Sequence, residues 1–110
     1  MITPSETTST LGALEATLSL GIESADTILI QTTGTWVGTI SPEVSLDGVN
    51  YVAAAVQAAN QTNSVTMVTS FTTNNIHKLF ASGFPFFRLR MSAYTSGTAT
   101  VIVHGDRQAK

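Results

Sequence analysis

Hydrophobic and polar residues alternate along most of the chain, in short runs that are separated by turn-forming residues. The alternation is clearest near the end of the chain, where Phe87, Leu89 and Met91 alternate with Arg88 and Arg90. A two-residue period predicts strands with one buried face. The runs that predict strands cover residues 15–22, 26–32, 35–40, 43–46, 49–56, 65–71, 76–80, 86–94 and 98–104.

These runs predict one all-β domain, an antiparallel β-sandwich of the jelly-roll or Ig-like kind, with seven to nine short strands over residues 13–110. A chain of 110 residues leaves no room for a second core. The helical spacing of Leu11, Leu14 and Leu18 competes with the alternation of residues 16–22, and we favour a strand there. Residues 1–12 are rich in Thr and Ser and predict an extended N-terminal arm.

Two turn signals interrupt the later strands. Asp47-Gly48 predicts a hairpin, with the side chain of Asp47 capping local amides. Ser96-Gly97 predicts a second hairpin, between residues 86–94 and 98–104. The core is predicted to include large side chains on the inward faces of these strands: Trp36, Phe71, Leu89, Met91, Val101 and Val103.

The composition limits the classes of function. Only 11% of the residues are charged, the formal net charge is −2, and there are five Lys and Arg. So few cations do not suit binding to nucleic acid. A surface of Thr and Ser loses little side-chain entropy when it is buried, which suits a subunit of an assembly. The N-terminus lacks a secretory pattern, and no apolar run predicts a membrane span.

The residues that could carry chemistry are scattered. The chain has no cysteine, and His77 and His104 lie on different predicted strands without metal-ligand spacing, so we expect two surface or edge histidines. No nucleophile motif and no pair of carboxylates suggests a catalytic site. We therefore expect no enzyme activity, no metal and no cofactor.

Four residues near the start of the predicted strand 86–94 are candidates for an interface: Phe84, Phe86, Arg88 and Arg90. An outward-facing aromatic beside an arginine is typical of interface hot spots. Two alternatives remain open. Phe84 and Phe86 could close the end of the domain, and the arginines could pair with acidic residues on a neighbouring strand.

Tyr51 and Asp47 are candidates for contact with a glycan. Tyr51 and Trp36 could form a stacking platform for a sugar, although such residues are more often core anchors. We expect Trp36 in the core and Tyr51 partly exposed.

The segments GTWVGTISPEVSLDGVNYVAA and GFPFFRLRMSAYTSGTATVIV resemble a class of small virion proteins of tailed bacteriophages, over roughly residues 26–104. The class combines a Gly-Thr-Trp strand, a Ser-x-Asp-Gly hairpin and an Arg-x-Arg strand. The hairpin from Ser45 to Tyr51 is also similar to that of discoidin-type carbohydrate-binding modules, in which Trp usually stands where this chain has Tyr51.

The resemblance implies a β-sandwich structural component of a phage particle, made in the host cytoplasm and without catalytic residues. The short chain and its arm favour a head decoration (cement) protein that clamps neighbouring capsid subunits. Its expected partners are copies of itself, with a trimer as the favoured form, and the major capsid protein or other virion proteins. The alternatives are a tail, neck or fibre component, or a carbohydrate-binding module.

Overall fold

The computed structural model describes residues 5–21, 26–59, 67–81 and 83–106. In these residues the chain forms seven strands and no helix, so none of the described segments is a helix that could cross a membrane. The strands are β1 (Ser5–Leu11), β2 (Thr17–Gly21), β3 (Thr27–Ser45), β4 (Val52–Ala53), β5 (Gln57–Ala58), β6 (Ile76–Phe80) and β7 (Phe86–Asp106).

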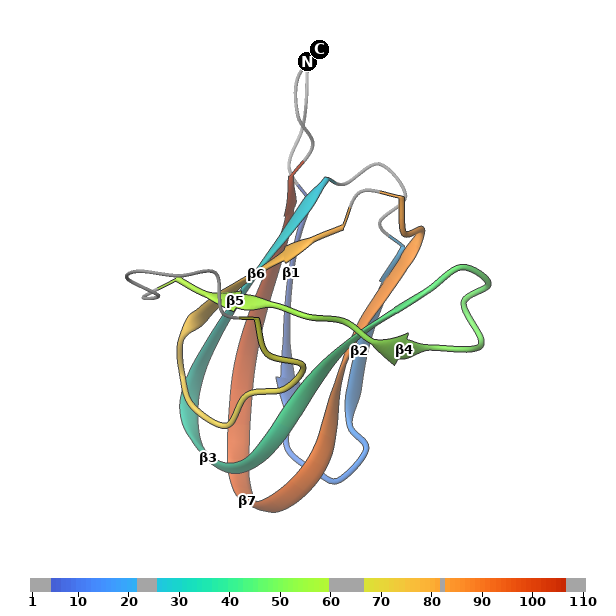
Figure 1. Cartoon of the computed structure of the whole chain (residues 1–110). Helices are drawn as coiled ribbons and strands as arrows, with labels where there is room; N and C mark the ends of the chain where they lie inside the picture. The colour runs from blue at the N-terminus through green and yellow to red at the C-terminus, as the bar shows by residue number, and fades with distance from the viewer. Residues whose placement is uncertain (1–4, 22–25, 60–66, 82, 107–110) are drawn as a thin grey trace.

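The two longest strands, β3 and β7, organise the fold. They pair antiparallel along the whole of β3, from Thr27 opposite Asp106 to Ser45 opposite Phe86. The other edge of β7 pairs with β1 and β2, while β3 pairs on its far side with β6 and β4, and β5 follows β6. Every pairing is antiparallel and joins all seven strands in one sheet (Figure 1). The pairing confirms an all-β antiparallel fold but does not show two separate sheets.

Two irregularities in the β3–β7 register accompany the curvature of these strands in Figure 1. They lie between Val37 and Gly38 and between Thr39 and Ile40. Each places an extra residue in β7, and such bulges bend and twist a strand. They also interrupt the alternation of faces that Phe87, Leu89 and Met91 begin: Ala93 is exposed, whereas Tyr94 packs against the core.

The long strands replace several short ones that the sequence predicted. The predicted segments 26–32, 35–40 and 43–46 merge, without their outermost residues 26 and 46, into one strand, β3, which runs through Pro42. The carbonyl of Pro42 accepts the N–H of Ala54, at 2.9 Å, on the β4 side. In a strand, the N–H and C=O of one residue point to the same side. The missing N–H of Pro42 therefore removes no hydrogen bond to β7.

The hairpin predicted at Ser96-Gly97 is wrong. Ser96 pairs with Val37 and Gly97 pairs with Trp36, so the chain continues through these residues within β7. Gly97 has the positive φ that its turn signal suggested, 84°, but it uses this conformation inside a strand. A local turn signal therefore did not predict a chain reversal.

Three other segments have a different secondary structure from the one that the sequence predicted. Ser5–Leu11, assigned to the arm, is strand β1, which pairs with β7, and Leu11 is fully buried; residues 1–4 lie outside the described residues. In the segment 49–56 only Val52–Ala53 is a strand. Residues 67–71 make isolated bridges, from Val68 and Phe71, whereas residues 65 and 66 are not described.

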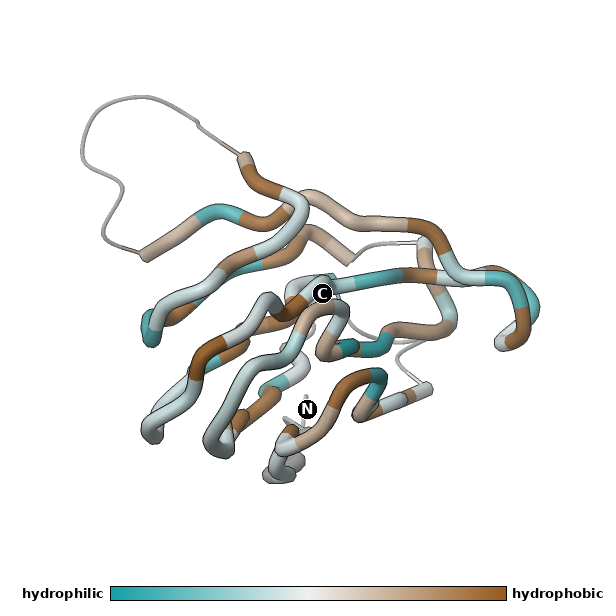
Figure 2. The backbone as a smooth tube through the Cα atoms, turned by 90° about the horizontal axis from the view of Figure 1, so that it is seen from below, coloured by the Kyte–Doolittle hydropathy of each residue, from teal (hydrophilic) through white to brown (hydrophobic). Residues whose placement is uncertain are grey.

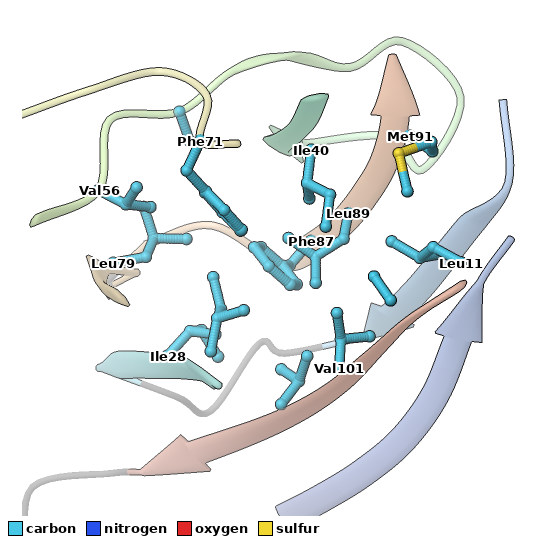
Figure 3. Packing of buried hydrophobic residues seen from close by; sticks show 14 of the residues in the cluster. Leu11, Ile28, Ile40, Val56, Phe71, Leu79, Phe87, Leu89, Met91 and Val101 are labelled. Carbon is cyan, nitrogen blue, oxygen red and sulfur yellow. The ribbon is translucent and has the colours of Figure 1, made fainter. Parts of the chain in front are cut away.

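The core prediction is confirmed at all six positions. Leu89, Met91 and Val101 are fully buried, and the other three are at most 9% exposed. Figure 3 shows side chains that converge from opposite sides: Ile28 and Val101 point toward Ile40 and Phe71, with Phe87 between them. Burial of each such side chain contributes about 1.5–3 kcal/mol. The folded sheet therefore encloses a single apolar core.

Candidate functional site

Three of the interface candidates share the outer face of β7. Phe86, Arg88 and Arg90 alternate with the buried Phe87 and Leu89. All three are half-buried, because the neighbouring strands and a loop supply partners for them. Phe84 precedes the strand and is 36% exposed.

The two arginines form ion pairs with Glu43 of β3. Arg88 Nε donates to Glu43 Oε1 at 2.6 Å, and Arg90 donates to Glu43 Oε2 from Nε at 3.2 Å and from Nη2 at 3.1 Å. Arg90 Nη1 also donates to both carboxylate oxygens of Glu15, at 3.0 and 3.2 Å. Of the two alternatives for these arginines, the structure shows the pairing with acidic residues of neighbouring segments.

The electrostatics of this network favour the charged forms. Burial alone raises the pKa of Glu43, but the hydrogen bonds from Arg90 and Arg88 and their charges outweigh it, so that its pKa lies below 4.5. The hydrogen bond to Glu43 is the main reason why the pKa of Arg90 is raised. The two arginines and two glutamates balance in charge, so we regard this network as a structural element rather than an anion-binding site.

We expect Glu43→Gln to destabilise the fold by about 2–3 kcal/mol at neutral pH, since it removes the carboxylate that Arg88 and Arg90 share and leaves the two arginines side by side with only the exposed Glu15 beside Arg90. The expected loss of stability is smaller than that caused by breaking a fully buried ion pair, because the side chains of Arg88 and Arg90 are 28% and 27% exposed. Urea denaturation at pH 7 measures the change.

Glu15→Gln is the matched control, since the side chain of Glu15 is 59% exposed. It should cost less than about 1 kcal/mol. Because the pKa of Glu43 is lowered, its stabilising effect is present above pH 4.5 and is lost as the pH falls through the folded-state value. The Glu43→Gln protein should therefore lose less stability in acid; equal effects of the two substitutions would contradict the role of Glu43.

The loop between β3 and β4 folds over this network. The guanidinium carbon of Arg88 lies 4.1 Å from the centre of the Tyr51 ring, a cation–π contact. A Cβ added at Gly48 would lie 3.4 Å from the ring of Phe86, so the loop backbone rests on that ring. Arg88, Tyr51 and Phe86 thus form one continuous surface, which the sequence had divided between two candidate sites.

The side chain of Asp47 holds the loop in shape. Its Oδ1 accepts hydrogen bonds from the backbone N–H groups of Val49 and Asn50, both at 2.8 Å, and from the hydroxyl of Ser45 at 2.9 Å. Its Oδ2 accepts from the side-chain amide of Asn50 at 2.9 Å. These bonds, led by the one from the Asn50 backbone, lower the pKa of Asp47. The predicted capping role is confirmed, and both carboxylate oxygens are used inside the loop.

The hairpin formed by this loop and β4 carries an exposed apolar tip that the sequence did not predict. Leu46, Val49 and Val52 are 74%, 78% and 64% exposed, and Figures 1 and 2 show the hairpin projecting from the side of the molecule. The sequence had placed all three residues in strands. Their position on either side of the Asp47-Gly48 turn is the signal from which their exposure could have been predicted. Exposed aliphatic side chains grouped on one rigid loop are typical of an interaction surface.

Trp36 is not part of this surface. It is 9% exposed, and its indole N–H donates to Asn74 Oδ1 at 2.7 Å. Trp36 is therefore a core residue, as favoured, while Tyr51 is partly exposed on the outer face. The structure does not bring the two rings together as a platform.

His77 lies in the core, so its predicted place at the surface or an edge is wrong. It is 3% exposed, and its ring stacks on Phe71 with the centroids 4.1 Å apart. Its Nδ1 makes no hydrogen bond. Within the described ranges no three His, Asp or Glu side chains gather as metal ligands.

Burial lowers the pKa of His77 below 6.5. As the pH falls below about 6.5, His77 therefore becomes protonated in the unfolded chain but not yet in the folded chain. The contribution of this group to the stability of the fold should be complete above that pH and should decrease as the pH falls through it. We expect the urea midpoint to decrease as the pH falls below about 6.5. His77→Phe should flatten this slope, whereas His104→Gln should keep it; a slope that persists in His77→Phe would contradict the assignment.

Comparisons with known proteins identify the fold but no family. No protein-family model and no curated protein match the sequence. Among solved structures, the chain is similar to the SPBc2 prophage-derived protein YomS, with a TM-score of 0.76 and 12% identity over 96% of both chains. It is also similar to the PBSX exported protein XepA, with a TM-score of 0.73 and 14% identity over 92% of this chain; it spans only 38% of XepA.

Proposed function

We propose that this chain is a non-catalytic structural protein of a phage particle, and specifically a head decoration protein that binds the capsid surface. The observation that carries the proposal is the fold match to YomS, a prophage-derived protein, over 96% of both chains. At 12% identity the match supports a common fold, and the role is our inference from it.

The outer surface supports a role in binding. The charged groups beside the projecting hairpin are engaged with one another, and the hairpin presents Leu46 and Val49 to solvent. Because Asp47 fixes the loop before any partner arrives, little conformational entropy is lost on contact. We therefore assign this apolar tip as the contact with the capsid. Repetition over a particle would let weak single contacts hold the protein in place.

The experiment asks where the protein lies in purified particles. Heads and tails are separated and analysed by mass spectrometry, and we expect the chain in the head fraction. Its absence from particles would overturn the structural role. Its presence in tails alone would overturn the head assignment in favour of a tail, neck or fibre component.

Binding to capsids that lack the protein tests the contact residues. We expect the double substitution Leu46→Ser and Val49→Ser to weaken binding about tenfold or more, as loss of a central apolar contact does. Leu14→Ser is the control, since Leu14 is 59% exposed and lies outside the hairpin. Equal binding by the two variants would overturn the assignment of the tip.

A carbohydrate-binding module remains the alternative, because Tyr51 is half-exposed beside the Asp47 turn. It has less support, since Arg88 covers one face of the Tyr51 ring and the loop uses both oxygens of Asp47. Retention on a glycan array that is lost in Tyr51→Ala would favour this alternative.

A further inference from the structure

The two sides of the sheet end differently. Beyond β3 the sheet ends in β4 and β5, which have two residues each. Beyond β7 it ends in β1, with seven residues, and β2, with five. Very short edge strands protect a sheet against pairing with another chain, whereas a long edge strand presents a row of free N–H and C=O groups. The β1 side is therefore the less protected one.

Strand β1 also lacks the residues that usually protect an edge. Its sequence, SETTSTL, contains no Pro, Gly, Lys or Arg, and Glu6 is its one charged residue. All seven residues pair with β7, from Ser5 opposite Gly105 to Leu11 opposite Ala99. Among the described residues no strand pairs with the other edge of β1. The backbone of this edge is thus available for a further strand.

We propose that β1 pairs antiparallel with β1 of a second copy, about a twofold axis at Thr8. This register pairs the full length of both strands and places Thr8 opposite Thr8, Thr7 opposite Ser9, and Glu6 opposite Thr10. It sets the like charges of the two Glu6 residues apart and brings Thr and Ser together, which are favourable cross-strand neighbours.

The second copy is the favoured occupant of this edge because the strand is complementary to itself in that register. The contact closes with two copies, since each presents the same surface to the other. The trimer expected from the sequence would need a second surface. This inference rests on the sheet edge alone and holds independently of any role in a phage particle.

Substitutions at Thr10 test the register, since Thr10 is exposed and would face Glu6 of the second copy. Sedimentation analysis of the full chain measures the dimer dissociation constant. We expect Thr10→Glu to weaken the dimer by about three- to thirtyfold, through two like-charge pairs, and Thr10→Lys to strengthen it. Thr10→Gln, the neutral control, should lie between them.

Circular dichroism checks that the Thr10 variants keep their fold. A chain that stays monomeric up to millimolar concentration would overturn the proposal. A dimer that is indifferent to the charge at position 10 would overturn it as well.

A cysteine at the twofold axis gives an independent measurement, because the chain contains no cysteine. Opposed residues in antiparallel strands have Cα atoms about 4.5–5.5 Å apart, within the range that a disulfide spans. We expect Thr8→Cys to form a covalent dimer with oxidised glutathione as the oxidant. Thr72→Cys, at an exposed loop position, should not. Equal cross-linking of the two variants would overturn the assignment.

Discussion

Replacement of Leu89 by Asp is expected to unfold the domain. Leu89 is fully buried in β7, between Pro42 of β3 and Leu18 of β2. Loss of a buried leucine alone costs about 2–5 kcal/mol. A carboxylate at this position would in addition have to lose its hydration without a partner. Since small domains are stable by only about 5–15 kcal/mol, the sum exceeds what the fold can supply.

Circular dichroism and the fluorescence of Trp36 during thermal denaturation measure this loss. Leu14→Asp is the matched control, because Leu14 is 59% exposed and the same change of side chain removes little buried area there. We expect a cooperative transition in the control and none in Leu89→Asp. A soluble Leu89→Asp protein that melts cooperatively would contradict the place of Leu89 at the centre of the core.

Gly97→Ala should cause the second largest loss of stability, about 2–5 kcal/mol. Gly97 lies within β7 with φ at 84°, opposite Trp36. A Cβ there would fall against the carbonyl oxygen of Thr35 and 2.7 Å from the Cα of Trp36. Both neighbours are backbone atoms, so the strand pair itself would have to shift.

Substitutions at two other glycines distinguish the two causes of the loss of stability at Gly97, which are the positive φ and the close packing around an added Cβ. Gly83 has φ at 97° but no atom within 4 Å of an added Cβ, so Gly83→Ala should show only the backbone penalty, about 1–2 kcal/mol. Gly21 has open space around its Cβ position and no positive φ, and Gly21→Ala should change stability little. Denaturant midpoints of the three variants provide the measurement. If Gly97→Ala and Gly83→Ala lower the denaturant midpoint by the same amount, the role of close packing at Gly97 would be contradicted.

The candidate site was predictable where its chemistry is local. The capping by Asp47 depends on residues up to three positions away, so its turn signal was sufficient. The partners of Arg88 and Arg90 depend on which acidic residues the β3–β7 register places opposite them, and the sequence left two alternatives open. The exposure of Leu46 and Val49 also depends on where the pairing of β3 and β4 ends.

The sequence by itself determined the all-β class and the six core residues that it named, which belong to a larger buried cluster. The alternation around Leu89 and Met91 is imposed by a strand with one buried face, whatever that strand pairs with. Only the tertiary structure decided that Gly97 continues a strand, that residues 5–11 are paired with β7, and that an unpartnered edge remains at β1. Local patterns report which face of a strand is apolar, but register and neighbours come from pairings between residues far apart in the chain.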